Sequence, residues 1–276
     1  MAYDKVVDSA VLDGALTGIA DAIRGKTGNT DKLTLDEMAA AIAGISVGGG
    51  GEQFSALVDG RMTDFVANSE MQGIRSHAFY NATNLRSADL SELGKKGGKL
   101  RELIGYDAFH GCTALEHITL PMVLAEAGAG EEWMFSRAFE GCGLREFSTE
   151  YAGSFGWNSV QNFKNGKSLR TVRIPNIIFV SMDHFNGCSA LELVEFGGGT
   201  IGNNVFAGCA ALNTIIIRSD TLTALGNQNA FSGVPGPVQV HVNAALIEEY
   251  RAATNWASLY AAGTVDFVAI EGSEYE

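Results

Sequence analysis

Apolar residues recur along the middle of the chain in a pattern that is written several times over. The clearest copies follow Phe-x-Gly-Cys-x-x-Leu-x-x-Ile-x-Ile and begin at Phe109, Phe185 and Phe206. More degenerate copies keep the aromatic position, and the full series is Phe79, Phe109, Phe139, Phe163, Phe185, Phe206 and Phe231. The spacings are 30, 30, 24, 22, 21 and 25 residues, which is typical of a repeat solenoid.

This repeat predicts both the local structure and the packing. Apolar and polar positions alternate in each Leu-x-x-Ile-x-Ile segment, which favours a short strand. One turn of chain cannot enclose its own apolar residues, whereas stacked turns bury Leu on Leu and Phe on Phe. The strands then run parallel, about 4.8 Å apart. We therefore expect an α+β solenoid in which Phe109, Phe185 and Phe206 lie in one column.

Residues 1–47 have a different periodicity, which predicts a small N-terminal helical hairpin. Thr34 and Glu37 form a capping box that opens the second helix. The apolar stripe of the two helices consists of Leu12, Leu16, Ile19, Ile23, Leu35, Met38 and Ile42. Helices this short bury too little surface alone, so we expect the stripe to attach or oligomerise the chain. The alternative is that the hairpin folds back on its own solenoid.

The remaining boundaries follow from turn residues and apolar runs. Residues 48–53 are a Gly-rich linker. The solenoid with its caps is expected over 54–257, beginning with a β-hairpin over 54–67 and ending with a helical cap over 235–257. Leu246, Tyr250 and Trp256 are the expected plugs of the last rung. Residues 258–276 are predicted to form a C-terminal strand or tail.

The repeat resembles the BspA-like class of bacterial leucine-rich repeat over roughly residues 54–257. The resemblance is carried by Ala-Phe-x-Gly-Cys-x-x-Leu, as at Ala108-Phe109 and Ala138-Phe139. The copy at Phe163 departs from it by lacking the Ala and the Cys. The resemblance implies a right-handed coil that binds proteins or glycans at surfaces, without catalysis and without a cofactor.

Composition and charge exclude several partners. The net charge is −13, which argues against nucleic acid or an anionic membrane surface, since both need a basic patch. The first residues contain no continuous apolar run, so no signal peptide is expected. No stretch reaches the roughly 20 apolar residues of a membrane span.

Candidate chemistry is sparse. The four cysteines occupy one repeat position, which favours free buried thiols over disulfides, and no His or Cys pairing predicts a metal. Ser181, Asp183 and His184 are adjacent in sequence but do not make a triad, and His184 is expected at the edge of the coil. Glu131 and Glu132 are paired carboxylates that favour a solvated loop over a cation or glycan site. The prediction is a protein that is not an enzyme.

Two kinds of surface are candidates for binding. Polar positions that alternate with the apolar ones form the strand face, where His117 and Arg173 are the candidates. Aromatic residues also gather in segments that interrupt the repeat, and these are Trp133, Tyr151, Phe155 and Trp157. The alternatives are a merely solvated strand face, and aromatics that pack over an edge of the coil.

The N-terminal segment is similar to the opening segment of tail-associated structural proteins of phages that infect Firmicutes, as Leu16-Thr-Gly-Ile-Ala-Asp-Ala-Ile-Arg-Gly-Lys-Thr-Gly28 shows. It implies a virion protein, made in the host cytoplasm, that contacts other tail proteins through residues 1–45 and a host surface protein or glycan through the repeats. A homo-oligomer is expected, a trimer among the options. The alternative is a bacterial cell-surface adhesin or interaction protein. A glycan depolymerase is a third hypothesis.

Overall fold

The computed structural model describes residues 60–96, 103–122, 136–150, 160–180 and 182–276. The chain divides into two units, Met1–Arg61 and Met62–Glu276, and every described strand and helix belongs to the second. The predicted helical hairpin and its attachment stripe, the linker at 48–53 and the first half of the predicted β-hairpin lie outside the described residues.

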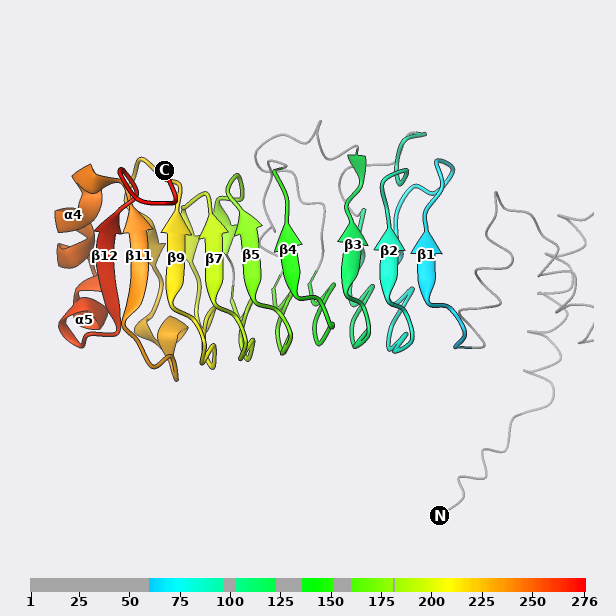
Figure 1. Ribbon diagram of the computed structural model, residues 1–276, viewed down its shortest axis with the longest axis horizontal. Helices are drawn as coiled ribbons and strands as arrows, with labels where there is room; N and C mark the ends of the chain where they lie inside the picture. Colours follow the sequence, from blue (N-terminus) through cyan, green and yellow to red (C-terminus); the bar gives the residue numbers. More distant parts are fainter. Residues whose placement is uncertain (1–59, 97–102, 123–135, 151–159, 181) are drawn as a thin grey trace, which may run out of the picture. The chain divides into compact units, whose positions relative to one another are not determined.

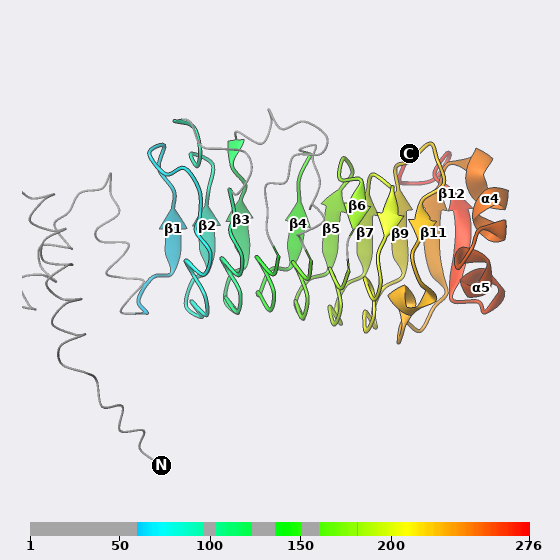
Figure 2. The ribbon, with the colours of Figure 1, turned by 180° about the vertical axis from the view of Figure 1, so that it is seen from behind.

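The described unit is a β-solenoid of about seven turns whose short strands are all parallel. One sheet has the order β1-β2-β3, with strands Asp64–Val66, Ser87–Asp89 and His117–Thr119. A second has the order β12-β11-β9-β7-β5-β4, with strands Val265–Ala269, Val238–Val242, Thr214–Ile217, Leu193–Phe196, Thr171–Ile174 and Glu146–Ser148. Figures 1 and 2 show these strands side by side, each contributed by the next turn of the chain. The prediction of stacked parallel strands is confirmed.

A third sheet was not predicted. Its order is β10-β8-β6, and its strands are only two residues long, Ala224–Leu225, Thr200–Ile201 and Phe179–Val180. Each follows a strand of the six-stranded sheet by a few residues, so three successive turns of chain pair along a second side as well.

The repeated phenylalanines form one continuous buried column, as predicted. From Phe79 to Phe206 neighbouring rings lie nearly parallel, with centroids 5.0 Å apart for Phe79 and Phe109 and 5.9 Å apart for Phe185 and Phe206, whereas Phe231 is tilted by 49° to Phe206. Phe65 tilts onto the first ring, at 4.6 Å, and Trp256 onto Phe231, at 5.8 Å. Stacking of this kind adds to the hydrophobic gain of burial.

Each rung turns sharply on either side of its phenylalanine, and the turn explains the glycine that follows. Gly111 and Gly187 have positive φ, and a Cβ added at either would lie 2.1 or 2.7 Å from an asparagine Oδ1 of the rung before. Those asparagines, Asn81 and Asn165, stand where other repeats have glycine and also have positive φ. Asparagine tolerates this conformation better than most residues, so the sequence departures at Phe79 and Phe163 keep the same turn.

The four cysteines are free and buried, and each thiol links two rungs. The Sγ atom donates to the carbonyl oxygen of the preceding phenylalanine at 2.9–3.1 Å. The pairs are Cys112–Phe79, Cys142–Phe109, Cys188–Phe163 and Cys209–Phe185. The repeat position therefore takes a residue that is small, apolar and able to donate one hydrogen bond.

We expect these thiols to be inert in the folded protein. Burial raises the pKa of Cys188 to about 12, and burial likewise raises the pKa values of Cys142 and Cys209. At pH 8, roughly one Cys188 in 10,000 is then a thiolate, the reactive form. A colorimetric thiol reagent should label none of the four cysteines within an hour, and all four after denaturation. Labelling of the native chain within minutes would contradict this arrangement.

The last rung is followed by two short helices and a strand. They are α4 (Ile247–Ala252), α5 (Trp256–Ala261) and β12, and the 3-10 segments η2 (Gln228–Phe231) and η3 (Ala244–Leu246) precede them. Tyr250 and Trp256 are fully buried: the Tyr250 hydroxyl accepts from the Thr223 N–H at 3.0 Å, and Trp256 Nε1 donates to the Thr223 carbonyl at 2.8 Å. Leu246 is only partly buried. Helix α5 was not predicted, and it extends past residue 257, where the predicted cap ends.

Candidate functional site

The outward positions of the parallel strands form a strand face, defined as two rows of aligned side chains. One row is Asp64, Ser87 and His117 in the first sheet and Glu146, Thr171, Leu193, Thr214, Gln239 and Asp266 in the second. The other is Val66, Asp89 and Thr119, then Ser148, Arg173, Glu195, Ile216, His241 and Val268. The register of the strands places equivalent positions of neighbouring turns next to one another.

A charged cluster lies on this face in the middle of the six-stranded sheet. The Glu195 carboxylate is 7% exposed and lies between two guanidinium groups. Arg173 Nη1 donates to Glu195 Oε2 at 2.5 Å, and Arg218 Nε donates to Glu195 Oε1 at 2.8 Å. Two cations on one carboxylate leave an excess positive charge in a surface that belongs to an acidic chain.

The first sheet presents a more open part of the face. Val66 is 52% exposed, and His117 and Asp64 are exposed. Hydrogen bonds from the hydroxyls of Ser87 and then Thr63 lower the pKa of Asp64, so its carboxylate stays charged in water. This part offers a negative charge and an imidazole that are free to contact a partner from solvent.

Two of the predicted binding residues can be located on the strand face, and they lie apart. His117 is in β3 of the first sheet, and Arg173 is in β5 of the second, engaged with Glu195. The four loop aromatics, Trp133, Tyr151, Phe155 and Trp157, lie outside the described residues. The structure therefore brings none of the predicted residues together into one cluster among those it describes.

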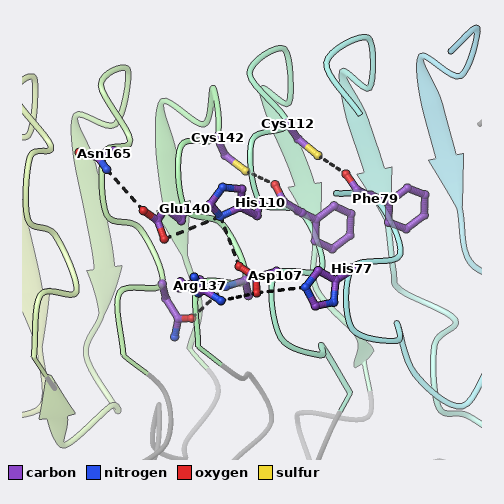
Figure 3. A network of polar contacts seen from close by, with 12 residues as sticks. His77, Phe79, Asp107, His110, Cys112, Arg137, Glu140, Cys142 and Asn165 are labelled. Carbon is purple, nitrogen blue, oxygen red and sulfur yellow. Dashed lines mark hydrogen bonds and ion pairs between the residues drawn. The ribbon is translucent and has the colours of Figure 1, made fainter. Parts of the chain in front are cut away.

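A second polar cluster, which sequence reasoning missed, lies at the turns next to the phenylalanine column (Figure 3). Its centre is Asp107, whose side chain is 3% exposed. Arg137 Nη2 donates to Asp107 Oδ2 at 2.7 Å, and His77 Nε2 lies 3.4 Å from the same oxygen. His110 Nδ1 lies 3.3 Å from Asp107 Oδ1, but neither atom makes a hydrogen bond within the described residues. We call these residues the turn cluster.

The turn cluster follows the repeat along the solenoid. His77, Asp107 and Arg137 each stand two residues before a column phenylalanine, and all three have positive φ. Tyr80 and His110 each stand one residue after, and their rings stack at 4.8 Å. Such pairs fasten neighbouring rungs. Because the contacts of the cluster join one turn to the next, its geometry supports a structural role.

The prediction for the position of His184 is wrong. This residue was expected at the edge of the coil, but it is completely buried, with Nε2 3.5 Å from Nδ2 of the equally buried Asn162. Both residues replace the alanine before the column phenylalanine in adjacent repeats, so the two exchanges accommodate each other. Asp183 instead interacts with Gln161 and Asn186, and does not orient His184 for catalysis.

Metal-binding groups and membrane-spanning helices are both absent from the described residues. These residues contain no group of three or more His, Cys, Asp or Glu side chains placed to hold a metal ion. None of their helices has the length and apolar character that crossing a bilayer requires.

The stacked strands define a leucine-rich-repeat solenoid. The family model described as "BspA type Leucine rich repeat region" matches in six copies, over residues 54–129, 100–150 and 159–246. The chain therefore belongs to the BspA-type leucine-rich repeat family. The match begins at residue 54, so the similarity of residues 1–45 to phage tail proteins gains no support from it. No curated protein matches the chain.

Solved structures of similar proteins come from several bacteria. A leucine-rich repeat protein from Bacteroides ovatus is 16% identical, over 76% of this chain and 66% of that one, with a TM-score of 0.32. The pneumococcal vaccine antigen PcpA is 16% identical, over 76% and 42%, with a TM-score of 0.37. The T. pallidum leucine-rich repeat protein is 21% identical, over 66% and 59%, with a TM-score of 0.25. The match spans less than two thirds of each of these proteins.

Proposed function

We propose that this chain is a bacterial cell-surface interaction protein of the adhesin type, which binds a partner protein through the strand face without catalysing a reaction. The supporting observation is the strand face of the six-stranded sheet, on which the repeat aligns charged side chains such as Arg173 and Glu195 in neighbouring turns. Extended faces of this kind are the usual binding surfaces of repeat solenoids. Membership of the BspA-type family supports an interaction role.

Arg173 and His117 are the residues that we propose for contact with the partner. Arg173 already has its charge and fork held in place by Glu195, so little conformational entropy is lost when a carboxylate binds beside it. His117 is exposed at the more open part of the face. Trp133, Tyr151, Phe155 and Trp157 stay predicted as additional contacts from the interrupting segments.

Binding of the labelled full-length chain to an array of extracellular proteins and glycans tests this function. We expect binding to at least one protein, weakened about ten-fold by Arg173→Ser, since arginine contacts often dominate interfaces. Lys167→Ser is the matched control, because Lys167 is exposed at a turn and not on a strand. Binding to glycans alone, no binding, or equal losses in the two variants would reject the proposal.

The phage-virion hypothesis stays a prediction, and fewer observations support it than support the cell-surface role. It depends on residues 1–45, which lie outside both the described residues and the family match. The attachment stripe, the contact with other tail proteins and the homo-oligomer depend on the same segment. Labelling purified virions with antibody against the solenoid tests it, and particles without the antigen would refute it.

A further inference from the structure

One part of the strand face is already covered by the chain itself. After β12 ends at Ala269, Ile270 N donates to the Val242 carbonyl at 2.9 Å, and the chain then turns at Gly272, where φ is +77°. Figures 1 and 2 show this last stretch leaving β12 and turning back towards β9. We call residues 270–276 the return segment.

Tyr275 is the residue of the return segment that contacts the face. Its ring meets the His241 ring edge-on, with the centroids 4.7 Å apart. Burial and then the neighbouring Glu274 raise the pKa of Tyr275, while a hydrogen bond with Thr214 and the positive charge of Arg173 act in the opposite direction. The tyrosine ring thus lies against β11, and Thr214 of β9 and Arg173 of β5 are near enough to act on its pKa.

The side chains beneath the return segment are buried, although their positions face outward. Ile216 is 0% exposed, and Thr214 and His241 are each 9% exposed. His241 Nδ1 is buried and has no hydrogen-bond partner among the described residues. The corresponding outward position in β1, Val66, is 52% exposed. Outward positions are therefore buried in β9 and β11, where Tyr275 lies, and exposed in β1 of the other sheet.

The return segment is tied to the solenoid at its start, where Glu271 Oε2 accepts from Ala244 N at 3.0 Å, and is otherwise held by its own hydrogen bonds. Ser273 Oγ donates to the Ile270 carbonyl at 2.6 Å, and Gly272 N donates to Glu276 Oε2 at 2.9 Å. Glu271, Glu274 and Glu276 are exposed, and Tyr275 is half-buried. Residues 272–276, which follow the Glu271 bond, form an exposed turn whose contact with the face is the Tyr275 ring, and they can leave the face without disturbing the phenylalanine column.

We propose that the return segment is a displaceable occupant of the strand face, and that this face takes a partner peptide in which a tyrosine is flanked by carboxylates. The ring of such a tyrosine fits against His241, its hydroxyl reaches Thr214, and the carboxylates meet the excess positive charge of Arg173 and Arg218. The inference rests on the proposed function, because it names the class of partner for the same face.

The test uses the full-length chain and a fluorescein-labelled peptide, Glu-Gly-Ser-Glu-Tyr-Glu, which copies residues 271–276. Fluorescence anisotropy measures its binding to the wild-type chain and to the Tyr275→Ala variant. We expect about ten-fold tighter binding to the variant, because a tethered competitor at an effective concentration near the millimolar range is removed. A second variant, carrying Glu274→Ser, Tyr275→Ser and Glu276→Ser, should behave alike and guards against misfolding of the first.

Two controls decide the specificity. In the Tyr275→Ala background, Arg173→Ser should weaken peptide binding about ten-fold and Lys167→Ser should leave it unchanged. A peptide with serine in place of tyrosine should not bind. Equal binding to wild type and both variants, or equal binding of the serine peptide, overturns the proposal. If the peptide fails while binding to the protein array still depends on Arg173, the occupant is rejected and the interaction role stands. If the peptide binds as expected and the array shows no partner, the return segment remains a displaceable occupant of the face and the proposed interaction role is rejected.

Discussion

We expect the Phe185→Ala substitution to lower the free energy of unfolding by about 3–5 kcal/mol, the usual cost of emptying a buried phenylalanine site. The Phe185 side chain is fully buried, with the rings of Phe163 and Phe206 stacked at 5.6 and 5.9 Å. The rungs cannot close over the gap, because backbone hydrogen bonds such as Phe185 N to the Val205 carbonyl, at 3.0 Å, fix their separation. Urea denaturation followed by circular dichroism measures the loss.

The matched control is Tyr80→Ala, which removes an aromatic ring one position away from the column. Tyr80 is 47% exposed and stacks on His110, so its removal should cost less than about 1 kcal/mol. Each turn of a solenoid is stabilised only by its immediate neighbours. The cavity left by Phe185→Ala in the middle of the column should therefore make unfolding less cooperative and lower the slope of the free energy of unfolding against urea concentration. Equal losses in the two variants would mean that the column does not carry the fold.

The phenylalanine column could be predicted from sequence because one large apolar side chain recurs at one position in every turn. When equivalent turns stack, that side chain must be buried against its equivalents in the turns before and after it. The cysteine position was predicted as small and buried for the same reason. What the pattern did not contain was the hydrogen bond from each thiol to the phenylalanine carbonyl of the previous rung, such as Cys188 to Phe163, since it depends on the offset between the turns.

The ion pairs between rungs were within reach of sequence reasoning but were missed. Arg173 and Glu195 are 22 residues apart, and Asp107 and Arg137 are 30 residues apart. Both separations equal the local repeat spacing, so opposite charges at one repeat position predict a contact. The signal is weak, because these charges do not recur in every turn as the apolar residues do. The expectation for His184 was wrong because an exchange for alanine was judged alone, without its neighbour Asn162 in the adjacent repeat.

Other features could not be predicted from the pattern. The strands of the third sheet have two residues each, which is too short for any periodicity to identify. The return segment contains Gly272 and Ser273 and reads as a turn, but nothing local indicates that Tyr275 folds back on His241. Contacts made by a short polar segment with a distant strand depend on where the last rung ends. They are therefore properties of the assembled solenoid.

We expect the Arg137→Asn substitution to lower the free energy of unfolding by about 2–3 kcal/mol near pH 8, because it leaves a buried carboxylate without its guanidinium partner. Asp107 is 3% exposed, and Arg137 Nη2 lies 2.7 Å from its Oδ2. Arg137 has a φ of +59°, and asparagine adopts this conformation readily, so the exchange removes the charge without adding backbone strain. Thermal and urea denaturation measure the change.

The Arg170→Asn substitution is the matched control, because it removes an ion pair of the same length that is exposed to solvent. Arg170 Nη1 lies the same 2.7 Å from Glu192 Oε1, but these side chains are 62% and 46% exposed. Water solvates both charges whether or not they pair, so the loss should stay below about 1 kcal/mol and vanish in about 1 M NaCl. The Arg137 effect should persist in salt, since Asp107 is screened from solvent. Comparable losses for the two variants would show that the turn cluster fastens the rungs no more firmly than an ordinary surface pair.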